Sequence, residues 1–331
     1  MGTINHLFQG GGELEIRLIP NPENAKSDAA LLLMHGPERL DAYLIDGGLA
    51  NGCTLEAVLA LRRRLLAEAQ LEDSEENRLA LTLLVTHCHV DHVAELYKNL
   101  IPCPYVAIDA LYLPPATALA TDGAYNNTRN GDLMHRPRLL SALMDHAPQA
   151  ALYTLAYGET RTLPLPGGCL RLFAPDRDWG APAGVDYVLR HYMADAPAER
   201  VFSNMPVRVL NCNCMWIQAE VGGHSMLFPG DAVKKLPQRD DESLDCMLAA
   251  YGELLRSDVV KYPHHGVKRN EAASMVASEL RKGNGPAVLA CSDAEKEAAP
   301  ILDALGVPHM NLADGTQVFV LSAEGVQYIQ P

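Results

Sequence analysis

The alternation of hydrophobic and polar positions predicts short strands and amphipathic helices along the whole chain. Glu13–Ile19 alternates apolar and polar side chains, the period of a half-buried strand. Ala29–Met34 and Leu79–Val85 are continuous apolar runs, which are typical of strands buried on both faces. Between these two runs, Thr54–Leu71 carries leucine and valine at helical spacing. Arg62–Arg64 in this helix are expected on its solvent face.

The rest of the chain continues this alternation, and we predict the following elements. Strands are expected over Ala42–Ile45, Ala151–Ala156, Arg161–Leu165, Cys169–Phe173, Val207–Val221, Ser225–Phe228, Val259–Tyr262 and Ala287–Cys291, helices over Pro137–Asp145, Asp241–Arg256, Asn270–Lys282 and Glu295–Gly306, and a hairpin over Gln317–Ile329. Because strands and helices occur in both halves with no Pro/Gly-rich linker, we predict one α/β (α+β) domain over residues 1–331. Insertions are expected at about 111–148 and 175–206.

Composition narrows the class of protein. The 331 residues are 48% hydrophobic and 21% charged, which allows a large core and excludes disorder of the whole chain. The net charge of −14 argues against extended nucleic-acid binding as the function, because a surface this acidic repels polyphosphate. Met1–Gly12 has no basic or apolar stretch of an export signal, and the eight cysteines show no framework spacing. We therefore expect a cytoplasmic protein without membrane association, and no obligate protein partner is indicated.

Three histidines and one aspartate follow directly after the apolar run that ends at Val85. His87 and His89 lie two residues apart, so an extended chain points both imidazoles the same way. Asp91 and His92 follow at the expected start of a helix. Imidazole and carboxylate groups gathered at a strand end are suited to bind a borderline metal such as zinc.

Two further polar motifs also follow apolar strands. Asp231 ends the sequence Phe-Pro-Gly-Asp, and His264 and His265 follow Val259–Tyr262. Strand ends are where α/β proteins gather their functional loops. Taken together, the three motifs supply five imidazoles and two carboxylates, enough for two metal ions about 3.5–4 Å apart that share one carboxylate.

The motifs resemble a known family. The sequence from His87 to His92 matches the His-x-His-x-Asp-His signature of the metallo-β-lactamase superfamily, and Asp46 in "YLIDGG", Asp231 in "LFPGD" and His264 in "KYPHHG" follow in that family's order. The later part is most similar to the hydrolase domain of ComEC-type competence proteins and to related phosphorylcholine esterases, through "NCNCMWIQAEVGGHSMLFPGD", "VVKYPHHG" and "NLADGTQVFVLSAEGVQYI". The resemblance covers roughly Glu13 to Ile329. It implies an αββα sandwich, in which two mixed β-sheets flanked by helices carry metals at one edge.

The resemblance also implies a role for each matching residue. His87 and His89 would hold metal one, Asp91, His92 and His264 would hold metal two, and Asp231 would bridge them. His265 is the alternative to His264, and whichever of the two is not a ligand would support the site or touch substrate. Asp46, Asn213 and His191 are further candidates for substrate contact or support. The implied cofactors are two divalent transition metals, with zinc as the first choice and manganese or iron as alternatives.

Some positions depart from the family pattern. The stretch Asn211–Cys214 stands where many members carry a further histidine, so metal one is expected to be weakly held unless His191 completes it. Cys212 and Cys214 are expected as packed thiols on one face of a strand. Glu95 replaces a small residue that is usual after the signature.

The function implied is hydrolysis by a metal-bound hydroxide, with Asp91 as the catalytic residue that orients it. A phosphodiester or phosphate ester is the favoured substrate, and a thioester or lactam is the alternative. A non-catalytic metal-binding or regulatory member stays open, as does a di-iron redox protein, although His89 and the lack of a flavin module count against the latter. Pro175–Pro206 is expected either to cover the site as a lid or to be a surface excursion elsewhere.

Overall fold

The computed structural model describes residues 3–20, 29–117, 135–178, 210–232, 243–266, 271–289, 297–312 and 315–329. Residues 118–134 of the first predicted insertion lie outside the described residues. Residues 179–206 of the second, which include His191, also lie outside them. The lid prediction for Pro175–Pro206 therefore stays a prediction.

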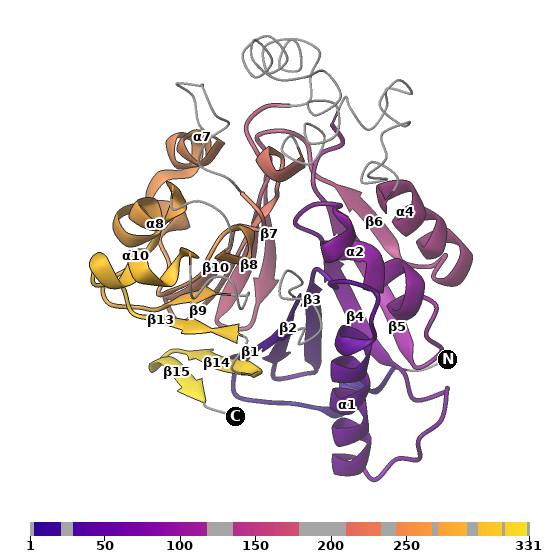
Figure 1. The fold of residues 1–331 in the computed structure, drawn as a ribbon. Helices are drawn as coiled ribbons and strands as arrows, with labels where there is room; N and C mark the ends of the chain where they lie inside the picture. The colour runs from indigo at the N-terminus through magenta and orange to yellow at the C-terminus, as the bar shows by residue number, and fades with distance from the viewer. Residues whose placement is uncertain are drawn as a thin grey trace.

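The described strands form two mixed sheets (Figure 1). The first sheet has eight strands in the order β15-β14-β1-β2-β3-β4-β5-β6. Its strands are β1 (Glu13–Ile19), β2 (Ala29–His35), β3 (Leu40–Ile45), β4 (Leu79–Leu84), β5 (Val106–Leu113), β6 (Ala151–Thr154), β14 (Gln317–Ser322) and β15 (Gly325–Ile329). Neighbours from β3 to β6 run parallel, whereas β15, β14, β1, β2 and β3 pair antiparallel.

The second sheet has seven strands in the order β13-β12-β11-β10-β9-β8-β7. Its strands are β7 (Thr160–Leu165), β8 (Gly168–Phe173), β9 (Trp216–Val221), β10 (His224–Phe228), β11 (Val259–Lys261), β12 (Ala287–Leu289) and β13 (His309–Asn311). Strands β10 to β13 run parallel, and β7 to β10 are antiparallel.

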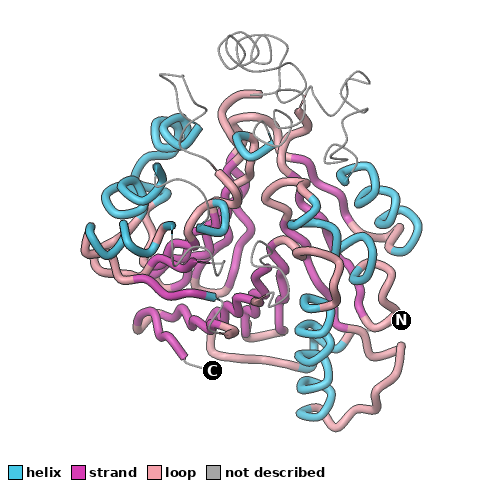
Figure 2. Tube along the Cα trace, in the orientation of Figure 1, coloured by secondary structure: helices cyan, strands magenta, loops and turns pink. Residues whose placement is uncertain are grey.

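Helices cover the outer face of each sheet (Figure 2). The helices on the first sheet are α1 (Cys53–Glu68), α2 (Val90–Glu95) with the π-helical turn η2 (Leu96–Leu100), and α4 (His135–His146), while η1 (Ile4–Leu7) lies beside β3 and β4. Those on the second are α7 (Ser243–Tyr251) with η5 (Gly252–Leu255), α8 (Glu271–Met275) with η7 (Val276–Leu280), and α10 (Ala299–Ala304).

Three apolar layers result from this arrangement. One lies between the first sheet and its helices, one between the two sheets, and one between the second sheet and its helices. Alternation within a strand divides its side chains between layers, as in β1, where Leu14, Ile16 and Leu18 all face the second sheet. The expected αββα sandwich is confirmed.

Most predicted elements are confirmed within a few residues, and three expectations need correction. The strand predicted over Val207–Val221 begins only at Trp216, because the preceding residues form a helical turn in which the amide of Asn213 donates to the carbonyl of Leu210 (3.0 Å). Cys212 and Cys214 are buried, as expected of packed thiols, but they do not share a strand face. Strands β5 and β13 were absent from the predicted elements.

The third correction concerns Arg62, which is 1% exposed rather than solvated. Its guanidinium donates to the carbonyls of Asn77 (2.8 Å) and Ser74 (2.6 Å), and it stacks over the ring of Tyr105. A planar group with five donors can satisfy several loop carbonyls at once, and this allows the charge to be buried. Among the described residues, no helix is both long and apolar enough to span a bilayer.

Candidate metal centre

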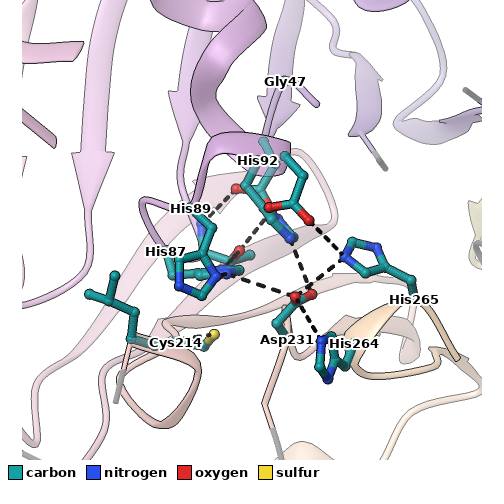
Figure 3. A network of polar contacts seen from close by, with 12 residues as sticks. Gly47, His87, His89, His92, Cys214, Asp231, His264 and His265 are labelled. Atoms are coloured by element: carbon teal, nitrogen blue, oxygen red, sulfur yellow. Dashed lines mark hydrogen bonds and ion pairs between the residues drawn. The ribbon is translucent and has the colours of Figure 1, made fainter. Parts of the chain in front are cut away.

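The candidate residues meet at one edge of the sandwich. Parallel pairing of β3 with β4 and of β10 with β11 sends the carboxyl ends of all four strands to this edge. Asp46 follows β3, the histidine motif follows β4, Asp231 follows β10, and the paired histidines follow β11. Figure 3 shows His87, His89, His92, Asp231, His264 and His265 turned toward one another across the gap between the sheets.

Two groups of side chains have the spacing of metal ligands. His87, His89 and Asp231 form one, and Asp91, His92, Asp231 and His265 form the other. In each group the ligand atoms lie within 4.8 Å of one another. Both groups contain Asp231, so one carboxylate is placed to serve two ions.

On the first sheet, the motif is supported by a buried carboxylate. Asp46 accepts hydrogen bonds from the backbone amide (2.8 Å) and the hydroxyl (2.7 Å) of Thr86, and its other contact is with Nδ1 of His92 (2.8 Å). The backbone amide of Gly47 donates to the carbonyl of His92 (2.6 Å), and a Cβ on Gly47 would lie 2.6 Å from the side chain of Leu96. These contacts fix the orientation of His92, which leaves Nε2 directed at Asp231 (3.1 Å).

His87 and His89 are held as neutral imidazoles. Nε2 of His87 lies 2.8 Å from Nδ1 of His89 and 3.9 Å from Asp231. Burial lowers the pKa of His87 well below its ordinary value and lowers the pKa of His89 to about 4. Nε2 of His89 is buried and has no hydrogen-bond partner among the described residues. A neutral imidazole with a buried lone pair fits a metal ion, which supplies the missing partner.

On the second sheet, Gly230 brings Asp231 close to the histidine motif. Gly230 has φ 60°, and a Cβ there would lie 2.9 Å from Cβ of Thr86 and 3.2 Å from Sγ of Cys214. Only glycine combines this φ with so close an approach. Asp231 is 2% exposed. Burial raises its pKa, but the facing imidazoles of His265, His92 and His264 outweigh burial and lower the pKa well below its ordinary value.

The carboxylates of Asp231 and Asp46 raise the pKa of His92, just as the imidazoles lower the pKa of Asp231. Although burial lowers the pKa of His92, these two carboxylates raise it well above the ordinary value. The pair His92–Asp231 therefore binds a positive charge between its nitrogen and its oxygen, and a metal ion can take the place of that proton. Asp91 has a lowered pKa because the contact with His265 and the charge of His92 outweigh the effect of burial.

The two C-terminal histidines differ in position. Nε2 of His265 lies 3.3 Å from Asp231 and 3.5 Å from Asp91, and its side chain is 1% exposed. Nε2 of His264 lies 3.7 Å from Asp231, and its side chain is 31% exposed. Both residues have left-handed backbone, with φ 53° and 57°, which is uncommon for non-glycine residues and carries strain.

The remaining predicted residues lie as follows. Asp46 stands behind His92, away from Asp231. Asn213 is 2% exposed and belongs to the turn before β9, which is tied to the histidine motif by the bond from the Met215 amide to the Thr86 carbonyl (2.8 Å). His191 lies outside the described residues.

Thr86 was not among the predicted site residues, and no role was predicted for Glu95. Thr86 links Asp46 to Nδ1 of His87 (3.1 Å), and its place immediately before the motif was the available signal. Glu95 is fully buried and accepts hydrogen bonds from the amides of Gly52 (3.2 Å) and Leu55 (3.3 Å). A carboxylate at the first turn of α1 satisfies amides that have no partner within the helix. Glu95 therefore joins α1 to the helix of the metal motif.

No known family model and no curated protein sequence matches the chain. Among solved structures, the chain is similar to unliganded yeast PDE1, with 12% identity, coverage of 91% of this chain and 98% of that one, and a TM-score of 0.49. It is also similar to the MIM-2 metallo-β-lactamase (16% identity, 89% and 92% coverage, TM-score 0.33) and to the hydrolase AbOPH of the β-lactamase superfamily (15%, 69% and 73%, 0.34). The chain has the metallo-β-lactamase fold. Its features in this chain are two mixed β-sheets that pack face to face, with helices on both outer faces.

Proposed function

We propose that the chain is a metal-dependent hydrolase of the metallo-β-lactamase superfamily and that it cleaves a phosphodiester or a phosphate ester. The observation that carries the proposal is the pair of ligand groups that share Asp231. A structural cluster of histidines would have its nitrogens satisfied by protein partners, whereas Nε2 of His89 is buried without one.

The donor set fits divalent transition metals. His87, His89 and Asp231 would hold one ion, and Asp91, His92, Asp231 and His265 would hold the other. Imidazole and carboxylate ligands suit zinc, with manganese and iron as alternatives. Two ions bound there would supply a nucleophilic water ionised near neutral pH and would stabilise negative charge on the reacting group.

The residues of the candidate centre have different parts in this proposal. Asp91 is the most exposed carboxylate of the cluster, with a side chain that is 25% exposed, and its lowered pKa keeps it ionised at neutral pH. We assign to Asp91 the orientation of the attacking water through a hydrogen bond. Asp46 and Thr86 orient His92 and His87, and Asp231 joins the two halves.

We assign the ligand position to His265 in place of His264. The deeper burial of His265 and its shorter distances to both carboxylates support this choice. The more exposed His264 is then left on the open side of the centre, where it can touch substrate.

The choice of a phosphoester rests on the resemblance of "LFPGD", "KYPHHG" and the closing strands to ComEC-type domains and phosphorylcholine esterases. A small substrate suits the net charge of −14 better than duplex DNA does, because binding of DNA requires many cationic contacts.

The test is turnover of a chromogenic panel by protein loaded with zinc or manganese. We expect hydrolysis of bis(4-nitrophenyl) phosphate or 4-nitrophenyl phosphate that exceeds hydrolysis of a thioester and a β-lactam. Faster cleavage of the thioester or lactam would replace the proposed substrate class. Two bound ions with no turnover of any compound would instead identify a non-catalytic metal-binding protein.

A further inference from the structure

A buried histidine lies beside the metal centre without belonging to either ligand group. His135 is the first described residue of α4 and is 5% exposed. Its Nδ1 lies 3.0 Å from the hydroxyl of Tyr97, and the two rings are 5.9 Å apart. Tyr97 belongs to η2, which directly continues the helix that carries Asp91 and His92. The pair therefore connects α4 to the metal motif.

The contact with Tyr97 determines what the other ring nitrogen can do. When the phenol donates to Nδ1, the imidazole carries its proton on Nε2, an assignment that follows from this hydrogen bond. Burial, with the nearby charges of Arg138 and Lys98, lowers the pKa of His135, so the ring is neutral at pH 7. Among the described residues, the hydrogen bond of His135 is that with Tyr97, and the residue is only 5% exposed. A preoriented N–H donor is thus left without an acceptor in the described part of the chain.

The start of α4 is electrostatically close to the centre. The carboxylate of Asp91 acts on the pKa of His135, and the guanidinium of Arg136 acts on that of Cys88 within the histidine motif. Helix α4 packs on α2 and η2, and Figure 1 shows α4 and α2 on the same outer face of the first sheet. Lys98 and Arg138 add positive charge around His135, in a chain whose net charge is −14. An anion that approaches the centre from this side would be attracted.

We propose that His135, fixed by Tyr97, is a substrate-contacting residue that donates a hydrogen bond from Nε2 to an anionic oxygen of the phosphoester. The inference rests on the proposed function and deepens it, because it assigns the anionic group of the substrate a place beside α4. The hydrogen bond involves no proton transfer. A buried histidine with only a packing role would support the stability of α4 and leave affinity for anions unchanged.

The experiment measures binding of phenylphosphonate and of inorganic phosphate to the metal-loaded protein by calorimetry. His135→Phe keeps a ring in the same space and removes the donor. We expect phenylphosphonate to bind roughly 10- to 100-fold more weakly, the range for one hydrogen bond to a charged group. His135→Gln, which restores an N–H, should recover part of the affinity. Tyr97→Phe should cause a smaller loss, because the ring keeps its donor but no longer its fixed tautomer.

The matched control is His146→Phe, at the exposed end of the same helix, which should bind phenylphosphonate as the wild type does. Metal content and melting temperature are measured for every variant. In protein labelled with ¹⁵N-histidine, the Nε2 resonance of His135 should shift when phenylphosphonate is added to the wild type.

The outcomes separate this inference from the proposed function. Unchanged affinity in His135→Phe at full metal content would overturn the inference, and so would loss of metal from that variant. If the wild type hydrolyses no ester, the proposed function fails, while the phosphonate affinities and the His135 resonance still decide whether His135 contacts an anion.

Discussion

On the eight-stranded sheet, the imidazoles of the candidate centre are oriented by hydrogen bonds, with Asp46 and Thr86 holding His92 and His87 from behind. On the seven-stranded sheet, His264 and His265 are consecutive residues that both have left-handed backbone, at φ 53° and 57°, whereas on the first sheet only Asp46, behind His92, has this conformation among the described residues of the centre. The first half is preorganised by buried polar contacts. The second is placed by a strained backbone, a conformation that persists only where the surroundings enforce it. Asp231 is the residue on which both halves converge.

The largest effect is expected where the halves meet. Asp231→Asn removes the charge that both ligand groups share. Loss of a group that only supports a ligand costs up to about 100-fold in metal affinity, so loss of this shared ligand should lower the affinity for both ions by more than that. Hydrolysis should be lost with the metal, while the fold is kept. Metal analysis after dialysis and circular dichroism measure these effects. The control is Asp303→Asn, whose side chain is 72% exposed and which should bind two ions.

The next effect distinguishes the two strained histidines. His264→Gly removes a left-handed non-glycine residue whose side chain is 31% exposed, and it should gain about 1 kcal/mol in unfolding free energy. His265→Gly removes a buried ring that contacts Asp231 and Asp91, so it should lose stability. His265→Gly should lose one of the two ions, whereas His264→Gly should retain both. Metal counting and urea denaturation on the same samples test this. Loss of an ion from His264→Gly alone would reverse our assignment.

Breaking the network of the first sheet should have an intermediate effect. Asp46→Asn keeps the shape of the side chain and tolerates the left-handed backbone at φ 54°, but it removes the charge beside His92. Metal affinity should fall about 10- to 100-fold. The comparison is Asp41→Asn on β3, the strand that precedes Asp46, where the partner Arg39 is 63% exposed and little change is expected. Competition with a chelator measures both affinities.

The smallest effect concerns the link between α1 and the motif helix. Glu95→Gln removes the charge that faces the amides of Gly52 and Leu55 and should cost about 1 kcal/mol of stability. Metal content should be unchanged, because Glu95 belongs to neither ligand group. Glu68→Gln, 54% exposed at the other end of α1, serves as the control in urea denaturation. An equal loss in both variants would show that the cap contributes nothing.

Patterns of apolar residues were sufficient to predict most of the strands, whereas the αββα architecture was implied by the resemblance of the motifs to a known family. The half-buried strand β1 was predicted to its ends because its alternation is regular. The turn before β9 was mistaken for strand, since Asn and Cys in alternation imitate a period of two while the backbone makes a helical turn. Arg62 was misplaced because its burial depends on the carbonyls of a distant loop, which no local pattern reveals.

The candidate site was predictable to the level of motifs but not of individual partners. The ends of parallel strands brought the histidines and aspartates to one edge, as the spacing indicated. Which of His264 and His265 points toward Asp231 depends on the positive φ angles of both residues, which the sequence does not reveal. The role of Thr86 depends on a contact with Asp46, forty residues away in the chain. The single domain over residues 1–331 and the cytoplasmic location stay predictions.

The most direct test of the account is a crystal structure of zinc-loaded protein with anomalous differences recorded at the zinc edge. We predict two peaks about 3.5–4 Å apart. One should lie against His87 and His89, the other against Asp91, His92 and His265, and the carboxylate of Asp231 should touch both. A peak held by His264 in place of His265 would correct the ligand set, and peaks remote from Asp231 would contradict the central claim.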